Sequence, residues 1–466
     1  MIGWALVAYA AAAEWTLAAA VAHALANNLE LRGEALDARS ADVALVEARA
    51  ARGPTLSGGA SVSGYDDAAS PDAADDGAAW NLGVAQPLPT GGTLWLGGAQ
   101  DHAFSRRLGP DASVYSFSGA TLTQPLLDGA WGAARYGIDR ARFGVRGAQL
   151  AERDARERLV VDVANAYWEL VAARESTRLA ERAATIAEQQ LADTKERFDE
   201  GFAGSGDVLQ VERALGVARQ SFVVARATEA GAGRVLARRM GLPLEAAPAL
   251  ALTDRPAPPD AAPDAARALA EAREGNAAYA LAKLAVEVAR REQGAARLAA
   301  LPNLDLSASV GVSADSDPAG ALPALTASPE AAWSLGATVS VPLAFAGARA
   351  EVEQGAIGLS RAEIEANAAW EDLVGQVAQA VDAVVRDRAR VDLATATLAA
   401  AEAGLAADQE LYREGRGSTR DVVRSLEVLE EAQVGRLAAE IDLQAAWLAL
   451  ARLRGRVLEE MVEEGG

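Results

Sequence analysis

The sequence predicts a mainly α protein with a small β part, in which a set of long helices and short strands occurs twice in tandem. Two observations predict this fold class. First, 114 of the 466 residues are alanine, which is the best helix former and is small enough for neighbouring helices to pack closely. Second, short motifs return along the chain at nearly constant offsets, which indicates a duplicated unit.

The internal repeat is visible as five pairs of matching residues. They are Asn28 and Asn276, Pro54 and Pro302, Pro125 and Pro342, Gly201 and Gly415, and Asp207 and Asp421. The offset is 248 for the first two pairs, 217 for the third and 214 for the last two. The first copy therefore carries a net 31 extra residues between its strand regions.

The repeat divides the chain into expected domains. Residues 15–240 would form the first repeat, with a helix, four strands, a long helix, a tip turn and a helix. Residues 264–459 would form the second repeat, in the same order but with two strands. Between them, residues 241–263 contain six prolines and predict a linker, and residues 460–466 would be a tail. Residues 1–14 hold an apolar stretch that is either the remnant of an export signal or a frayed terminus.

Most of the chain is expected to be helical. We expect helices near 16–51, 130–199, 206–240, 262–299, 347–413 and 420–458. Apolar residues recur every seven residues along the second long helix, at Trp370, Val377, Val384, Val391, Leu398, Leu405 and Tyr412. The matching positions of the first copy include Val163, Leu170, Ala184, Leu191 and Phe198, but also Arg156 and Thr177. This period predicts left-handed supercoiling against a partner helix, and a solvated helical bundle is the alternative.

Short segments beside the long helices alternate between apolar and small polar residues. In the second copy, residues 303–313 and 333–342 show this pattern, and in the first copy the segment from Leu56 to Val62 does. The pattern and the length of about 9–11 residues are typical of a tilted strand that crosses an outer membrane. An ordinary sheet with one wet face is the alternative. Because one chain has few such strands, several chains would be needed to close a barrel.

The composition argues against several other functions. The net charge of −21 disfavours nucleic acid as a partner. Cysteine is absent and there are only two histidines, so we expect no metal site. The sequence contains no phosphate-binding loop, nucleophile-elbow motif or metal-ligand spacing. We therefore expect no catalytic residues, no cofactor and no enzymatic activity, and no apolar run long enough for a transmembrane helix.

With these features together, the sequence resembles the TolC-like outer membrane factors, the exit ducts of Gram-negative efflux pumps and type I secretion systems. The resemblance covers nearly the whole chain. It is carried by the duplication, by the segments 124–129 (QPLLDG) and 341–347 (VPLAFAG), and by two turns that end in Gly-Asp-Val-Leu and Arg-Asp-Val-Val.

The resemblance implies a trimeric α/β-barrel duct, in which each copy gives transmembrane β-strands to one barrel and coiled-coil helices to a tunnel across the periplasm. It implies a location in the Gram-negative outer membrane, in contact with outer membrane lipid. The implied partners are two further copies in a homotrimer, a periplasmic adaptor (membrane fusion) protein and an inner-membrane pump of the proton-driven or ABC type. The negative charge would make the water-filled bore favour cations. A soluble coiled-coil structural or scaffold protein is the alternative, although it needs no alternating strands.

By resemblance, the turns at 200–207 and 414–421 would be periplasmic tips that close the tunnel and meet the adaptor. The implied gate residues are Asp207, Tyr412, Arg416, Arg420, Asp421 and Arg424. The implied adaptor-contacting residues are Gly201, Phe202 and Gly415.

Two positions of these tips depart from the family. Arg424 stands where the family has a second acidic residue, and Gly417 stands where the family has the Arg that joins the Tyr and Asp of the gate. The resemblance therefore implies a gate whose link is made differently. Turn chemistry is the alternative for the tip residues, because Gly supplies a positive φ and Asp caps the following helix.

The first copy also departs from the family between its strands. It holds the segment 86–92 (QPLPTGG) as well as 124–129, with strand-like stretches at 93–98 and 114–123 between them. These predict an added strand pair, so that a trimer would close about 18 strands. The alternative is that the added hairpin folds outside the barrel.

Overall fold

The computed structural model describes residues 14–65, 75–105, 113–127, 130, 132–201, 204–257, 259, 262–316, 325, 329–341, 345–414, 416 and 419–463. The expected export-signal remnant and the loop within the added hairpin lie outside these residues. The chain divides into two compact units. The first comprises Met1–Asp37, Gln149–Leu281 and Asn367–Gly466, and the second comprises Ala38–Ala148 and Ala282–Ala366.

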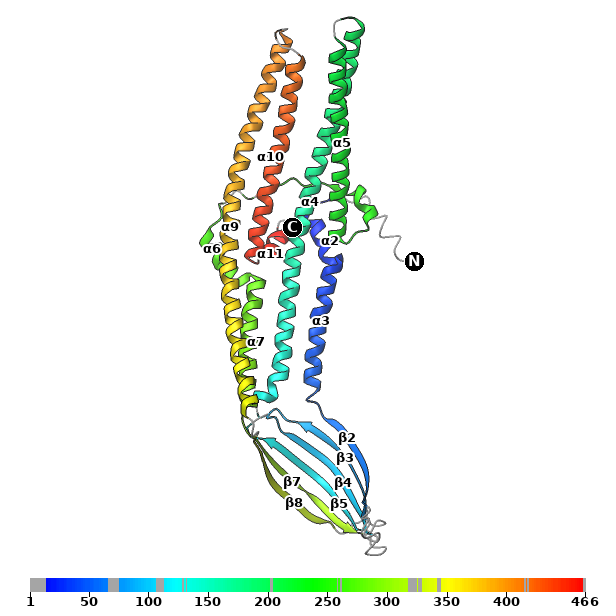
Figure 1. Cartoon of the computed structure of the whole chain (residues 1–466), viewed down its shortest axis with the longest axis vertical. Helices are drawn as coiled ribbons and strands as arrows, with labels where there is room; N and C mark the ends of the chain where they lie inside the picture. The colour runs from blue at the N-terminus through cyan, green and yellow to red at the C-terminus, as the bar shows by residue number, and fades with distance from the viewer. Residues whose placement is uncertain are drawn as a thin grey trace. The chain divides into compact units, whose positions relative to one another are not determined.

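The first unit is built from helices (Figure 1). Its shorter helices are α2 (Leu17–Asn27), α5 (Ser205–Met240), α6 (Ala265–Gly275), α10 (Thr419–Leu453) and α11 (Val457–Glu463). It shares with the second unit the long helices α4 (Gly132–Asp199) and α9 (Phe345–Arg413), as well as α3 (Leu29–Ala50) and α7 (Ala277–Ala299). Among the helices of the described residues, none is long and apolar enough to span a membrane.

A first apolar core surrounds the middle of α4. Val163, Tyr167 and Leu170 are fully buried there against α2, the end of α5 and α11. The Tyr167 hydroxyl donates a 2.8 Å hydrogen bond to the carbonyl of Trp15 in β1 (Glu14–Trp15). This strand pairs in parallel with β6 (Ala251–Leu252), so the segment between the two repeats is tied to the core.

A second apolar core surrounds the middle of α9. Leu373, Val377 and Val384 are buried there against α6 and α10. Val377 and Val384 are two members of the predicted seven-residue series, and their counterparts Val163 and Leu170 are buried in the first core. The series therefore marks the packed stripe of both long helices in this unit.

Two predicted helices are each interrupted in the structure. The sequence predicts one helix over 16–51 and one over 262–299, but the structure has α2 followed by α3 (Leu29–Ala50), and α6 followed by α7 (Ala277–Ala299). The breaks fall at Asn28 and Asn276, whose ψ angles of 131° and 119° are extended. Each Asn caps the helix that follows it, so the helical backbone stops and restarts there although the sequence pattern runs on.

Two further boundaries differ from the expectation. The segment 241–263 is not only a linker, because it contains a 3₁₀ helix, η2 (Leu244–Ala249), as well as β6. The last helix was expected near 420–458, but α10 ends at Leu453, where the chain turns through Gly455 with a φ of +70°. The short α11 then extends into the residues expected to be a tail.

The second unit contains an antiparallel sheet whose six strands follow one another in chain order (Figure 1). The strands are β2 (Thr55–Tyr65), β3 (Asp75–Pro87), β4 (Thr93–Ser105), β5 (Ser113–Pro125), β7 (Asn303–Ser316) and β8 (Glu330–Ser340). Within the segment 86–92, a turn joins β3 to β4, with Gly91 at a φ of +93°. The added hairpin therefore lies within the sheet, between β3 and β7.

The two faces of this sheet differ in polarity. Because directly opposite residues on paired strands point to the same face, the register assigns one face mainly to apolar residues and the other mainly to Gly, Ser and Thr. On the apolar face Val62 is 86% exposed, Trp333 is 78% exposed and Leu56 is 74% exposed. The large exposed residues of this apolar face include Leu56, Val62, Leu82, Val84, Leu96, Val310, Trp333, Leu335 and Val339.

A row of glycines crosses the opposite face. Gly83, Gly97, Gly119 and Gly311 lie directly opposite one another on four successive strands. A Cβ atom at Gly97 would collide with the carbonyl oxygen of Leu82 across the strand pair. The rings of two aromatic side chains cover this row, Trp95 at Gly83 and Gly97, and Phe117 at Gly119 and Gly311. Glycine therefore permits a close approach of backbones that no other residue allows here.

Candidate functional site: the two helical tips

The first tip joins α4 to α5. Helix α4 ends at Asp199, and the N–H of Gly201 donates a 2.9 Å hydrogen bond to the carbonyl of Phe198. Gly201 has a φ of +83°, a conformation that residues with a Cβ adopt at a cost. No described residue other than its chain neighbours comes within 4 Å of the position that a Cβ of Gly201 would take, so the backbone conformation and not a neighbouring side chain requires the glycine.

Asp207 starts the return helix of this tip. The N–H of Gly204 donates a 2.9 Å hydrogen bond to the Asp207 carboxylate, which stands at the third position of α5. An acidic side chain in the first turn also interacts favourably with the helix dipole. Asp207 is therefore a helix cap, and it is exposed.

The second tip joins α9 to α10 and repeats this plan. Helix α9 ends at Arg413, and the N–H of Arg416 donates a 2.8 Å hydrogen bond to the carbonyl of Leu411. Asp421 stands at the third position of α10, the place that Asp207 has in α5, and it is also exposed. The repeat offset of the tips thus relates two acidic residues in the same helical position.

A shallow hollow lies below the second tip, between α9 and α10. It has a volume of about 510 Å³ and is lined by Asp408, Asp421, Arg424 and Ser425, among others. The Ser425 hydroxyl donates a hydrogen bond to the Asp408 carboxylate across the two helices. The structure thus brings Asp421 and Arg424 to one surface, with an exposed acid and an exposed base within one helical turn.

Arg416, a further implied gate residue of this tip with a described side chain, does not line the hollow. The Arg416 guanidinium lies 3.4 Å from the carboxylate of Glu414 in its own turn, and both side chains are largely exposed. The side chains of Tyr412 and Arg420, and the residues Phe202 and Gly415, lie outside the described part of the chain.

Ion pairs that the sequence does not predict connect the helices behind the tips. Within the first hairpin, Lys195 of α4 lies 3.1 Å from Glu212 of α5. Between the two hairpins, Arg182 of α4 lies 3.2 Å from Glu430 of α10. No sequence signal marks this last pair, because its members are in different repeats and do not occupy equivalent positions in them.

A buried acid holds the second hairpin together further from the tip. Asp387 of α9 is 3% exposed and accepts hydrogen bonds from Arg386 and Arg390. The hydrogen bond from Arg386 holds the pKa of Asp387 below its usual range, and Arg390 adds to the effect. Arg390 also donates a 2.7 Å hydrogen bond to Asp442 of α10, so one guanidinium joins acids of both helices.

The described residues of the two tips present charged side chains of both signs. Exposed acidic and basic groups stand at the two turns, and they are held by helix caps and ion pairs. Among the described residues, no cluster of three potential metal-binding side chains occurs.

The fold and these tips can now be compared with known proteins. The sequence model of the family described as outer membrane efflux protein matches residues 20–241 and 268–456, which is most of the chain. No curated protein sequence matches the chain significantly.

Solved outer membrane channels have the same fold. The CmeC outer membrane channel of Campylobacter jejuni is 16% identical with a TM-score of 0.71, over 96% of this chain and 88% of that one. VceC of Vibrio cholerae is 18% identical with a TM-score of 0.66, over 94% and 96%. The MtrE channel of Neisseria gonorrhoeae, in its open state, is 18% identical with a TM-score of 0.66, over 95% and 89%.

The family and these solved structures are channels, not enzymes, and they confirm the resemblance that the repeats and tip turns predict. The chain belongs to the outer membrane efflux protein family.

Proposed function

We propose that three copies of this chain form the outer-membrane exit duct of a tripartite efflux pump or a type I secretion system, and that the two tips gate it on the periplasmic side. The observation that carries the proposal is the family match over both repeats, together with a sheet that has a strongly exposed apolar face.

The apolar face supports contact with lipid. Large apolar side chains such as Val62, Trp333 and Leu335 are mostly exposed on it, and a soluble protein rarely exposes a contiguous patch of this kind. The opposite face is mainly Gly, Ser and Thr, which suits a water-filled bore. A soluble coiled-coil scaffold, the alternative function, gives no reason for such a face.

The edges of the sheet support assembly with further copies. Five successive antiparallel pairings separate β2 from β8, so these two edge strands run in opposite directions. The β8 edge of one copy can therefore pair antiparallel with the β2 edge of the next, and a ring of copies leaves no free edge. Three copies are expected from the family resemblance.

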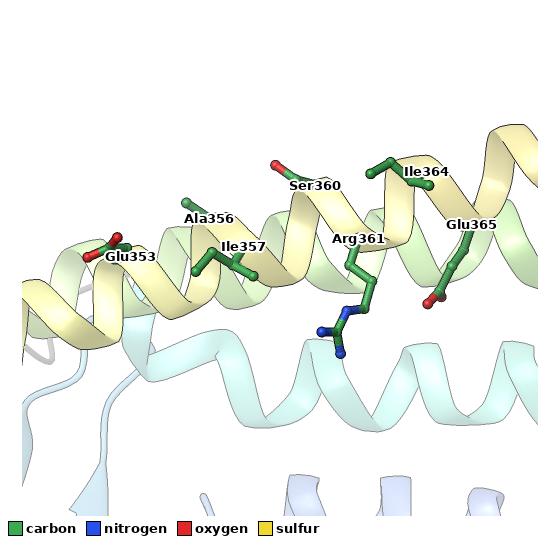
Figure 2. A pocket seen from close by; sticks show the side chains of 7 residues that line it. All are labelled: Glu353, Ala356, Ile357, Ser360, Arg361, Ile364 and Glu365. Carbon is green, nitrogen blue, oxygen red and sulfur yellow. The ribbon is translucent and has the colours of Figure 1, made fainter.

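Exposed apolar stripes on two helices of the second unit fit the same assembly. Figure 2 shows the α9 stripe, where Ile357 and Ile364 stand two helical turns apart and are 56% and 68% exposed. On α3, Val43 and Val46 are similarly exposed. Helix α3 leads into β2 and α9 follows β8, so each stripe accompanies one edge of the sheet.

At the tips, the proposal assigns gating to the charged residues and adaptor contact to the turns. Asp421 and Asp207 would stand at the aperture with Arg416, Arg420, Arg424 and Tyr412, and Gly201, Phe202 and Gly415 would meet a periplasmic adaptor protein. The space beside Gly201, where no described residue other than its chain neighbours comes within 4 Å of an added Cβ, supports this contact. An inner-membrane pump, proton-driven or ABC type, would select the cargo and supply the energy, as the family resemblance implies.

Reconstitution tests this function directly. The full chain is expected to require detergent, to have the native mass of three copies, and to conduct ions across a planar bilayer with a preference for cations. A monomer that stays soluble without detergent and does not insert into bilayers would contradict the proposal.

A further inference from the structure

Two hairpins of the sheet repeat each other along the sequence. Thr55 and Leu56 begin β2, and Thr93 and Leu94 begin β4, at an offset of 38. At the other end, the sequence of residues 86–91 (QPLPTG) returns in residues 124–129 (QPLLDG), and the first two residues of these segments end β3 and β5. The same offset thus relates both the first and the last strand of each hairpin.

The pairing register of the two hairpins is also the same. Thr55 lies opposite Ala85 in the β2–β3 pair, and Thr93 lies opposite Thr123 in the β4–β5 pair. The offset of 38 relates Thr55 to Thr93 and also Ala85 to Thr123. Equivalent residues of the two hairpins therefore have equivalent partners on the neighbouring strand. A register that agrees residue by residue is not required by the antiparallel pattern alone.

A shared hydrogen-bond pattern marks the end of each hairpin. The side-chain amide nitrogen of Gln86 donates to the carbonyl of Pro87, at 2.8 Å, and to the carbonyl of Arg52 just before β2, at 2.9 Å. Gln124 donates in the same way to its own following proline, at 2.8 Å, and to Thr90 just before β4, at 3.1 Å. Arg52 and Thr90 are themselves related by the offset of the hairpins.

Within its described residues, the second repeat of the chain has no counterpart of the extra hairpin. It contributes one strand pair, β7 and β8, whereas the first repeat contributes two. Strand β5 pairs with β7 from Val114 to Pro125 without a break. The extra hairpin is therefore a regular part of the sheet and not an appendage.

We propose that β4–β5 is a tandem copy of the β2–β3 hairpin, and that it widens the outer-membrane exit so that it admits broader cargo than an exit with four strands per copy. The inference rests on the proposed trimeric duct. Three copies with the observed six strands would close eighteen strands, where four strands each would close twelve. Because barrel diameter grows roughly in proportion to strand number, the exit would be about 1.5-fold wider and its cross-section about two-fold larger.

The repeat itself supplies a deletion that tests this. Removing residues 60–97 joins Gly59 to Gly98 and fuses the start of β2 to the end of β4, in the phase that both strands have now. We call this the in-phase deletion. Gln124 would then face the carbonyl of Arg52 in place of that of Thr90. The matched control, the out-of-phase deletion, removes residues 60–96, one residue fewer, and so turns the second half of the fused strand to the wrong face.

We expect the in-phase deletion to assemble as a trimer with twelve strands, and the out-of-phase deletion to fail to assemble. The exit is measured with polyethylene glycols of graded size, added in planar bilayers on the side of the sheet. The largest polymer that enters should have about two-thirds of the width found for the full chain, in proportion to the strand number. A trimer of the shorter chain with an unchanged polymer limit would overturn the proposal, as would equal assembly of the two deletions.

The structure of the full-length trimer gives a readout that needs no variant. Six strands from each copy in the barrel wall support the inference, and four strands with the hairpin outside the wall overturn it while the export function stands. If the full chain forms neither a trimer nor a channel, the proposed function fails instead.

Discussion

Asn28 and Asn276 occupy equivalent places in the two repeats and make the same two hydrogen bonds. The side-chain oxygen of Asn28 caps α3 by accepting from the N–H of Leu31, at 3.1 Å, and its amide nitrogen donates to the carbonyl of Arg239, at 2.9 Å. In Asn276 the oxygen accepts from the N–H of Tyr279, at 2.9 Å, and the nitrogen donates to Leu453, at 3.2 Å. Each Asn therefore joins the start of one helix to the end of another.

Replacing either Asn by Ala should lower the free energy of unfolding by about 1–3 kcal/mol, because it removes a helix cap and leaves a carbonyl without its partner. Asn28→Ser is the matched control, because the shorter hydroxyl can still cap α3 and should recover about 1 kcal/mol. The measurement is thermal or guanidinium unfolding followed by circular dichroism in detergent. An unchanged midpoint in both Ala variants would contradict the assigned role.

The equivalence of Asn28 and Asn276 in the two repeats could be predicted from the sequence, but the helix breaks at these residues could not. A repeat offset relates residues of equal function whatever that function is. Whether an Asn continues a helix or caps a new one depends here on the carbonyl of Arg239 or Leu453, and neither is near in the chain. Alanine-rich flanks on both sides then favour one continuous helix as the sequence-based expectation.

The strands were predictable for a different reason. Alternation of apolar and small residues is local, so segments such as 303–313 show it directly. The row formed by Gly83, Gly97, Gly119 and Gly311 is not local, since it arises only when four strands take their register. The agreement of the two hairpins likewise needs the observed strand pairing before it can be recognised as structural.

At the tips, the sequence could identify position but not contact. The repeat offset relates Asp207 to Asp421, and each is the third residue of its helix. The ion pair of Arg182 and Glu430 follows from the packing of α4 and α10, and no periodicity in either helix points to it.

Gly97→Ala should prevent the sheet from forming, whereas Gly98→Ala should be tolerated. A methyl group at Gly97 would collide with the backbone of β3, but the nearest atom to a methyl group at Gly98 is the carbonyl oxygen of Phe117 at 3.3 Å, which a small shift relieves. The two positions are neighbours in β4, so strand propensity is the same for both. The yield of folded, assembled protein in detergent measures the difference, and equal yields would contradict a close backbone approach at Gly97.

Arg182→Glu should increase the fraction of time that the proposed duct is open, because it replaces the ion pair between the two hairpins by a repulsion. The pair has one exposed member, so it is worth about 0–1 kcal/mol, and its loss should shift the opening equilibrium by up to about five-fold. Single-channel recording in bilayers measures this fraction.

A charge exchange separates this effect from a general loosening. The double variant Arg182→Glu with Glu430→Arg restores an opposite pair and should return the open fraction toward that of the unchanged chain. Glu188→Gln is the control, because it breaks a 2.7 Å pair with Arg219 inside one hairpin and should leave opening unchanged. Equal effects of the control and of Arg182→Glu would contradict a role for the contact between hairpins.

Asp387→Asn should make the protein less stable at neutral pH and less sensitive to acid. The hydrogen bond from Arg386 keeps the pKa of Asp387 below its ordinary value of 3.8, so the folded state favours the carboxylate more than the unfolded state does. Its contribution is therefore complete above pH 3.8 and is lost as the pH falls through the lower folded pKa. Because Asp387 is buried between two arginines, the variant should lose about 1–3 kcal/mol at pH 7, and this difference should shrink as the pH falls below 3.8. Unfolding midpoints measured at a series of pH values from neutral to acidic follow this difference. Asp139→Asn is the control for an exposed pair, because Arg142 lies 3.2 Å from Asp139 on the surface of α4. If the two variants have the same pH profile, burial of Asp387 does not set its acid response.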